Sequence, residues 1–420
     1  MRDIVSDHQL VRAAVLVGAA AALTLRERRA SSPGVVLVPG FLALFLAAQP
    51  LVAAAALAVA VLAALIARYL VLPDGLAAWA RPVVALVAAV GLAALALLIP
   101  ALRPAWPRPL AGGLIAIIPG FLAVDLLERG AKASARTVGL AGLVTGALVL
   151  LPAGLWPGLV QSTVEPAAVR LAIASSLEPL ALILSIVAVA GLRHNLGLRG
   201  GVYLAPGLLA LTANSLAPAV FSVGVAFLTH VLVVKVSKGR LLLAGRTVMG
   251  LHVLVAAFLG WLVILAIGAL GGPVANSLGS LDALPLLVLL VPGLIAVDMS
   301  RSHPAATFVG LALCTSFVLA SCQLVMELGD QRRPAAVIVR LGIAVTTALT
   351  IFAPQLVRLG RVVGSQLWLL EPDPAAELLS AVPRPPRPSS GKAVVPARVA
   401  AAMLERANRA PTALPSLFDR

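Results

Sequence analysis

Long apolar segments follow one another along almost the whole chain, and short stretches that carry the charges separate them. Thirteen segments can be marked, at residues 10–25, 34–48, 51–67, 82–102, 110–124, 138–155, 171–192, 201–213, 219–234, 248–270, 284–297, 305–325 and 335–353. They lack the ten-residue alternating segments of a membrane β-barrel. Since helices and closed barrels are the structures that satisfy their backbone in lipid, the pattern predicts an all-α polytopic membrane protein with about 11 to 13 hydrophobic segments.

Two different Pro-Gly elements occur in each half of the chain, in the same order. The first surrounds Pro39-Gly40 and returns around Pro206-Gly207, at a shift of about 167 residues. The second, Ile-Pro-Gly-Phe-Leu-Ala-Val-Asp at 118–125, returns as Val-Pro-Gly-Leu-Ile-Ala-Val-Asp at 291–298. Two elements repeated in order predict a tandem duplication. We expect one membrane repeat at 1–160, a second at 165–328, an additional transmembrane segment at 329–360 and a Pro/Arg-rich cytoplasmic tail at 361–420.

The segments that carry these pairs are short. They hold roughly 13 to 16 apolar residues, whereas a spanning helix needs about 20, so we expect broken or re-entrant elements. In transporters, short interrupted segments at matching places of two repeats indicate the binding site, and the alternative is ordinary kinks or close-packing points. The residues predicted to line a substrate path are Pro39, Gly40, Pro119, Gly120, Pro206, Gly207, Pro292 and Gly293. Depending on how many elements cross, the repeats are parallel or inverted.

Composition and charge agree with a membrane location. The chain is 60% hydrophobic and 12% charged, with a mean hydropathy of +1.04, whereas soluble domains carry about 25% charged residues. The net charge of +15 fits either the positive-inside bias or a surface that meets an anionic polymer. Nucleic acid is not expected as a partner, because no soluble region is large enough for a reading module. With the N-terminus outside, 17 basic residues fall inside and eight outside, which favours a cytoplasmic C-terminus.

Several ionisable residues stand beside the Pro-Gly elements. Asp125 and Asp298 end the second element in each half, and each precedes an arginine, Arg129 or Arg301. Such a carboxylate could orient a substrate amine or hold a basic residue, and the alternative is an interfacial ion pair. Arg26, Arg68, Arg193 and Lys235 are further candidates, either for a basic rim that meets carboxylate-rich chains or for ordinary inside anchors. Glu27 stands among the arginines just ahead of the first Pro-Gly element and is a candidate for the same path. Glu178 is a second candidate for a buried acid.

Motifs of known chemistry are missing from the sequence. No phosphate-binding Gly-x-x-x-x-Gly-Lys-Ser/Thr loop and no Gly-x-Ser-x-Gly elbow occurs. His230, His252 and His303 lack metal-ligand spacing. Cys314 and Cys322 would lie about 12 Å apart along a helix, beyond disulfide reach, and are expected in the core. We therefore expect no catalytic residue, no metal and no cofactor bound by this chain.

Glu27, the run 32–44 and Gln49-Pro50 resemble the opening of the poly-gamma-glutamate biosynthesis protein family PgsC/CapC, and residues 118–125 are similar to its second Pro-Gly element. The resemblance covers roughly 10–155 and, more weakly, 171–325. Members are membrane subunits of capsule or poly-gamma-glutamate synthases that work with an ATP-dependent amide ligase of the Mur-ligase type. Family members are about one repeat long, whereas this chain fuses two.

The resemblance implies an accessory subunit in the bacterial inner (plasma) membrane. Its expected partners are the Mur-ligase-like amide ligase, other synthase membrane subunits, an anionic polymer and the lipid bilayer, with ATP and Mg on the ligase. One alternative is a stand-alone secondary transporter of a small organic anion. Another is a structural scaffold in which the Pro-Gly pairs only permit close packing.

Overall fold

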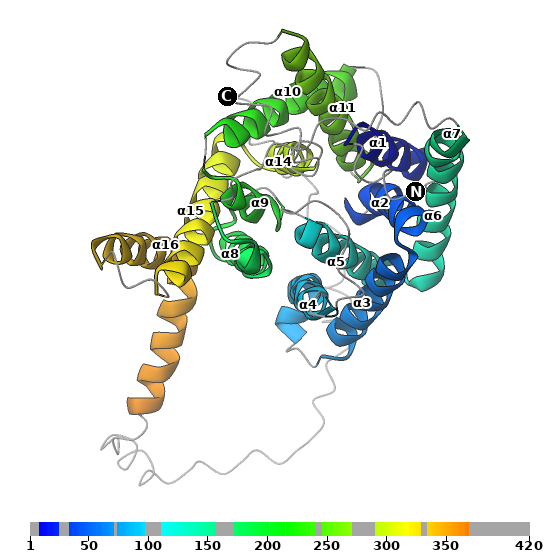
Figure 1. The fold of residues 1–420 in the computed structure, drawn as a ribbon. Coiled ribbons are helices and arrows are strands. Elements are labelled where there is room, and N and C mark those ends of the chain that lie inside the picture. The colour runs from blue at the N-terminus through cyan, green and yellow to red at the C-terminus, as the bar shows by residue number, and fades with distance from the viewer. Residues whose placement is uncertain are drawn as a thin grey trace, which may run out of the picture. The chain divides into compact units, whose positions relative to one another are not determined.

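The computed structural model describes residues 8–24, 33–70, 74–96, 99, 111–155, 172–200, 202–214, 216–239, 246–270, 290–328 and 334–368. These residues are almost entirely helical and contain no strand (Figure 1), which confirms the predicted all-α class. The contacts divide the chain into one unit up to Arg358 and a second from Leu359 to Arg420. The predicted linker at 371–391 and the short helix at 397–409 lie outside the described residues.

Each half contributes one series of helices. The first half contains α1 (His8–Thr24), α2 (Pro33–Ala48), α3 (Pro50–Tyr69), α4 (Asp74–Ala96), α5 (Ala111–Arg129), α6 (Ala131–Thr145), a π-helical turn (Gly146–Leu150) and α7 (Leu151–Leu155). The second contains a 3₁₀ turn (Ser175–Leu177), α8 (Glu178–Leu196), α9 (Ala205–Leu211), α10 (Ala217–Gly239), α11 (Arg246–Leu270), α14 (Val291–Met299) and α15 (Pro304–Leu328). Helix α16 (Pro334–Trp368) follows the second half.

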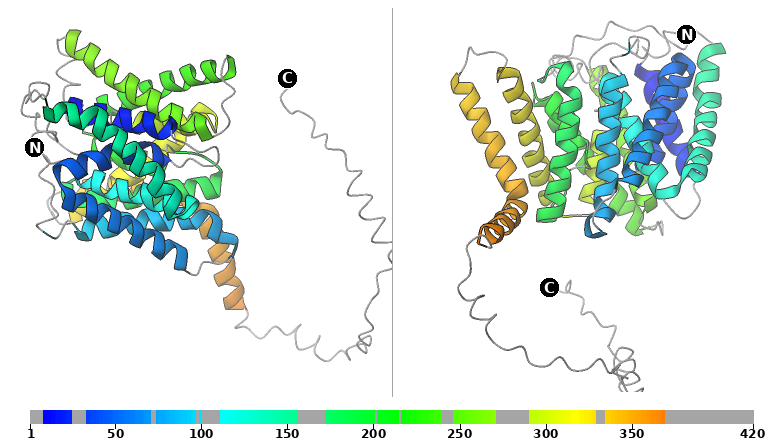
Figure 2. Two further views of the ribbon diagram at one scale, coloured as in Figure 1. Left: turned by 90° about the vertical axis from the view of Figure 1, so that its right-hand side faces the viewer. Right: turned by 90° about the horizontal axis from the view of Figure 1, so that it is seen from below.

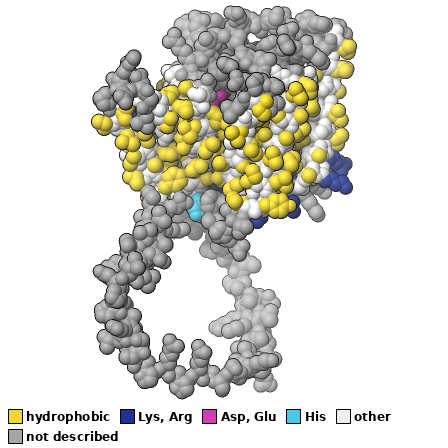
Figure 3. Space-filling model, turned by 60° about the horizontal axis from the view of Figure 1, so that its bottom comes forward, with side chains coloured by type: hydrophobic (Ala, Val, Ile, Leu, Met, Phe, Trp, Pro, Cys, Tyr) yellow, Lys and Arg dark blue, Asp and Glu magenta, His cyan; other side chains and the backbone are white. Residues whose placement is uncertain are grey.

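Seven described helical segments are long and apolar enough to cross a membrane. They are Pro50–Tyr69, Ala131–Leu150, Glu178–Leu196, Ala217–Lys235, Gly250–Ile267, Pro304–Glu327 and Ala336–Ala353. In both views of Figure 2 the helices up to Arg358 run side by side, as in a membrane helix bundle. Figure 3 shows hydrophobic side chains in a broad band over one face. The chain is a multi-pass helical membrane protein.

The two halves repeat the same packing pattern. In the first half α1 packs on α2, α3 on α4 and α5, α4 on α5, and α6 on α1 and α2. In the second half α8 packs on α9, α10 on α11 and α14, α11 on α14, and α15 on α8 and α9. The duplicated sequence therefore folds twice into the same arrangement, in which α1 matches α8 and α4 matches α11.

The contact between the halves is reciprocal. Helix α4 of the first half packs against α8, and its counterpart α11 packs against α1, the counterpart of α8. This relationship, in which each partner presents the same elements to the other, is that of a two-fold symmetric dimer interface. The fused chain thus resembles a dimer of its own repeats.

The short elements lie at the centre of each half. Phe41, Leu44 and Phe45 of α2 are among the largest fully buried side chains, and every residue of α9 and α14 is buried. At seven residues, α9 rises only about 10 Å, too little to cross a bilayer.

The repeated prolines occupy different positions in their helices. Pro39 and Pro119 lie inside α2 and α5, which continue through them. Pro206 and Pro292 stand instead in the first turns of α9 and α14. A first-turn proline costs no helical hydrogen bond, because its missing N–H would have no partner within the helix. The second repeat therefore has the shorter described helices at both of these elements.

A further proline explains the π-helical turn before α7. The ring of Pro152 would clash with the carbonyl of Leu148, four residues earlier, in a regular α-helix. The helical turn is wider here, because the Leu151 N–H donates to the carbonyl of Gly146, five residues earlier. The long helical span from α6 continues in this way up to Leu155.

Candidate functional site

The first Pro-Gly pair of each repeat packs tightly against the preceding helix. A Cβ on Gly40 would lie 2.5 Å from the carbonyl oxygen of Ala14, and one on Gly207 would lie 3.1 Å from the carbonyl oxygen of Ala181. Both glycines and both alanines are related by the shift of 167 residues. The two copies therefore use the same backbone approach of α2 to α1 and of α9 to α8.

The second Pro-Gly pair packs against the equivalent helix in each repeat. A Cβ on Gly120 of α5 would meet the Leu86 side chain of α4 at 3.0 Å. A Cβ on Gly293 of α14 would lie 2.9 Å from the Cα of Val253 in α11. Leu86 and Val253 are 167 residues apart, whereas Gly120 and Gly293 are 173 apart, because the second repeat has six more residues before this element. All four prolines and all four glycines of these elements are buried, so close packing is one demonstrated role of these positions.

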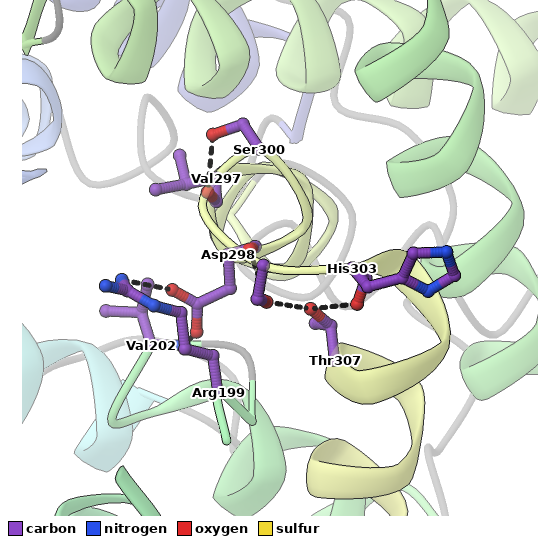
Figure 4. A network of polar contacts seen from close by, with 8 residues as sticks. Arg199, Val202, Val297, Asp298, Ser300, His303 and Thr307 are labelled. Atoms are coloured by element: carbon purple, nitrogen blue, oxygen red, sulfur yellow. Dashed lines mark hydrogen bonds and ion pairs between the residues drawn. The ribbon is translucent and has the colours of Figure 1, made fainter. Parts of the chain in front are cut away.

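A polar cluster surrounds the end of α14 (Figure 4). Asp298 is only 4% exposed, and its Oδ2 accepts a hydrogen bond of 2.8 Å from the backbone N–H of Val202. Its Oδ1 lies 3.7 Å from Nη1 of Arg199. The backbone carbonyl of Asp298 accepts from the Ser302 hydroxyl, which shares a hydrogen bond of 2.8 Å with Thr307 of α15. The carboxylate thus joins α14 to the segment before α9.

Three helices hold the described part of that segment, residues 197–200 and 202–204. Gly197 ends α8 with φ +65°, and Val202 has φ +38°, which is unusual and strained for a β-branched residue. A Cβ on Gly310 of α15 would lie 2.7 Å from the carbonyl oxygen of Arg199. The Ser185 hydroxyl of α8 donates to the carbonyl of Tyr203 at 2.7 Å. Helices α8, α14 and α15 therefore fix the segment together.

The equivalent carboxylate in the first repeat has a different partner. Asp125 Oδ1 lies 3.6 Å from Nη1 of Arg129, one turn further along α5. Arg129 also donates from Nη2 to the Thr137 hydroxyl of α6 at 3.1 Å. The side chains of Asp125 and Arg129 are 1% and 7% exposed, so this is a buried pair. It ties α5 to α6, whereas Asp298 ties α14 to the segment before α9.

The other candidates for a basic rim lie at helix ends. Arg68 and Arg193 stand in the last turns of α3 and α8, and Lys235 lies in the last third of α10; all three are exposed. Arg26 and Glu27 lie outside the described residues. Arg301, the arginine that follows Asp298 in the sequence, is exposed.

Several buried polar residues belong to spans and were not predicted as site residues. Arg12 of α1 and His252 of α11 are both fully buried, and the His252 ring stacks on His230 of α10 with ring centroids 6.2 Å apart. Arg12 stands out in the sequence as an arginine inside an apolar run, which is a signal of function in membranes. Glu178 is buried, as anticipated, in the first turn of α8, where the helix dipole favours a carboxylate.

Within the described residues, no group of three or more His, Cys, Asp or Glu side chains could hold a metal ion. Cys314 and Cys322 are free and buried, which confirms their predicted place in the core.

Together, the fold and the buried site define a helical membrane protein with an internal duplication. The sequence profile of the capsule biosynthesis CapC family matches residues 17–135 and 180–308, more than half of the chain. The chain belongs to this family, and the family domain is present twice. It is a membrane protein of the capsule synthesis type. Searches of curated proteins and of solved structures found no match.

Proposed function

We propose that this chain is a membrane subunit of a synthase that makes an anionic polyamide of the poly-gamma-glutamate type. It would anchor an ATP-dependent amide ligase at the cytoplasmic face of the bacterial inner membrane and assist elongation or export of the polymer. The observation that carries this proposal is the capsule biosynthesis match in both repeats, each of which includes both Pro-Gly elements and the following aspartate.

Two further features support a role without catalysis. The sequence contains no phosphate-binding loop, so ATP and Mg would be bound by the partner ligase. The polar cluster around Asp298 joins helices, and its described members include no nucleophile activated by a general base. Its residues are suited to holding a charged group.

The path for the polymer would follow the central short elements. Helices α2, α5, α9 and α14 contain the repeated Pro-Gly pairs and the two buried aspartates. Arg68, Arg193 and Lys235 would supply an exposed cationic rim for the carboxylates of the polymer, together with Arg26 in the sequence before α2. The neighbouring Glu27 would lie on the same path.

A second candidate function is secondary transport of a small organic anion. The buried aspartates in short, proline-containing helices favour it, since such residues often couple ions to substrates. It differs from the first proposal in requiring no ligase, and it predicts that neutralising Asp125 or Asp298 uncouples transport.

Affinity purification from mildly solubilised membranes, followed by mass spectrometry, tests the proposal. We expect a Mur-ligase-like amide ligase to co-purify with the full chain, and a chain ending at Leu370 would show whether the tail is the docking segment. Should the full chain purify alone while proteoliposomes containing it take up an organic anion, the transporter would replace the synthase subunit.

A further inference from the structure

Arg199 and Val202 present two donors to a single carboxylate. The backbone N–H of Val202 binds one oxygen of Asp298 at 2.8 Å, and the guanidinium of Arg199 lies 3.7 Å from the other. We propose that these two donors form a binding site for a ligand carboxylate, and that Asp298 occupies the site as an internal competitor. The identity of the ligand, a carboxylate of the growing polymer, rests on the proposed function.

The contact between Arg199 and Asp298 is long, so a ligand carboxylate could approach the guanidinium more closely. A charge-assisted contact between a guanidinium and a carboxylate is commonly about 2.7–2.9 Å long. The Arg199–Asp298 separation of 3.7 Å is much longer. A carboxylate that approached from the side of Arg199 could therefore bind the guanidinium more closely than Asp298 does.

The exposure of Arg199 and the fixed backbone around it both favour replacement of the Asp298 carboxylate by that of a ligand. The Arg199 side chain is 23% exposed, and that of Asp298 only 6%, so a ligand would reach the arginine first. Gly310 of α15 packs against the carbonyl of Arg199, and Ser185 binds the carbonyl of Tyr203. These contacts do not involve the Asp298 carboxylate, and they would keep the two donors in place after it leaves, which lowers the cost of binding a ligand.

Competition from Asp298 also favours ligands that carry several carboxylates. A tethered carboxylate acts at an effective concentration of about millimolar or more, so a single weak acid competes poorly. When one carboxylate of a polyanion leaves the site, a neighbouring carboxylate of the same molecule takes its place. The site is therefore suited to a polyanion.

The site belongs to the second repeat. The residue that matches Arg199 at the shift of 167 is Ser32, which carries no charge. Asp125 in turn pairs with Arg129 of its own helix. The fused copies have thus diverged at this position.

Binding of a defined probe to the purified full-length chain tests the inference. The probe is a fluorescent γ-linked pentaglutamate, with acetate and free glutamate as monovalent comparisons. Asp298→Asn removes the charge that competes for Arg199, and its neutral amide oxygen accepts the Val202 N–H more weakly than the carboxylate does, so a ligand carboxylate can displace it. We expect the pentaglutamate to bind at least about tenfold more tightly. Adding Arg199→Gln should abolish the gain, whereas Lys132→Gln, an equal change of charge at an exposed position of α6, should keep it.

Unchanged affinity in Asp298→Asn, or a gain that persists without Arg199, would overturn the site. If Asp298→Asn does not yield folded protein, Arg199→Gln alone decides: a loss of about tenfold in probe binding supports the site, and no loss overturns it. The proposed function is tested separately by co-purification with the ligase. If pentaglutamate, glutamate and acetate all bind more tightly and no ligase co-purifies, the result would support the site and contradict the proposed synthase subunit.

Discussion

The backbone nitrogen of Gly40 in α2 lies 2.5 Å from the position that a Cβ would take on Gly18 in α1. The two helices therefore touch backbone to backbone at this crossing. In the second repeat the residue that matches Gly18 is Ser185, whose hydroxyl accepts a hydrogen bond of 2.9 Å from the N–H of Gly207. The same crossing is thus closed by direct contact in one copy and by a hydrogen bond in the other.

Replacing Gly40 by alanine should destabilise the first repeat. The added Cβ would overlap the carbonyl oxygen of Ala14 and the Cα of Val15, so α1 and α2 must separate. Overpacking of this kind costs about 1–3 kcal/mol. Thermal unfolding of the purified protein, followed by tryptophan fluorescence, measures the loss. Gly139→Ala is the matched control, because a Cβ there meets nothing within 4 Å, and it should be neutral or slightly stabilising. Equal effects of both changes would contradict the packing role.

The buried Asp125–Arg129 pair should behave as one unit. Asp125→Asn leaves the guanidinium of Arg129 buried without its counter-charge, which costs about 3–5 kcal/mol. Adding Arg129→Gln removes that charge and should restore part of the stability. Unfolding of the two single variants and the double variant gives the coupling energy. Lys132→Gln, at an exposed position of α6, should change stability by less than about 0.5 kcal/mol. Strictly additive single effects would show that the two residues are not coupled.

The sequence predicts the architecture well because the signals for it are local. Apolar runs indicate helices in a membrane, and two different elements repeated in the same order mark the two halves. The shift of 167 residues read from Pro39-Gly40 and Pro206-Gly207 also relates the residues they pack against, Ala14 and Ala181. The prediction of buried cysteines likewise required only their positions inside a span.

The partners within the site could not be predicted in the same way. Asp298 and Val202 are 96 residues apart, and their contact depends on the path of the segment after α8. The sequence drew attention to the nearby Arg301, and the structure also brings Arg199, 99 residues before Asp298 in the chain, to the same carboxylate. Identical Pro-Gly dipeptides also lie inside a helix in one copy and at its start in the other, which the dipeptide alone does not specify.

Helix α16 should be dispensable for the fold of the two repeats. Its apolar window, Ala336–Ala353, is only 11% buried. Its contacts with the repeats include a hydrogen bond from Asn195 to the Ile351 carbonyl and an ion pair between Arg340 and Glu327. A chain ending at Leu328 should therefore give a single monodisperse peak in size-exclusion chromatography, with a melting temperature within a few degrees of the full chain. A chain ending at His303 also lacks α15, which packs on α8 and α9, and should aggregate. Aggregation of both would show that α16 is part of the core.

The reciprocal contact between the halves predicts that they associate without a covalent link. Each half contains its own full set of helix contacts, and the pairs α1–α11 and α4–α8 join the halves. When residues 1–163 and 164–420 are expressed together as separate chains, a tag on the first should retain the second through purification in mild detergent. Because the interface has the arrangement of a two-fold dimer, residues 1–163 expressed alone should pair with themselves, more weakly. Mixing the separately solubilised halves is the control for non-specific association in detergent, and halves that purify apart after co-expression would contradict the two-fold interface.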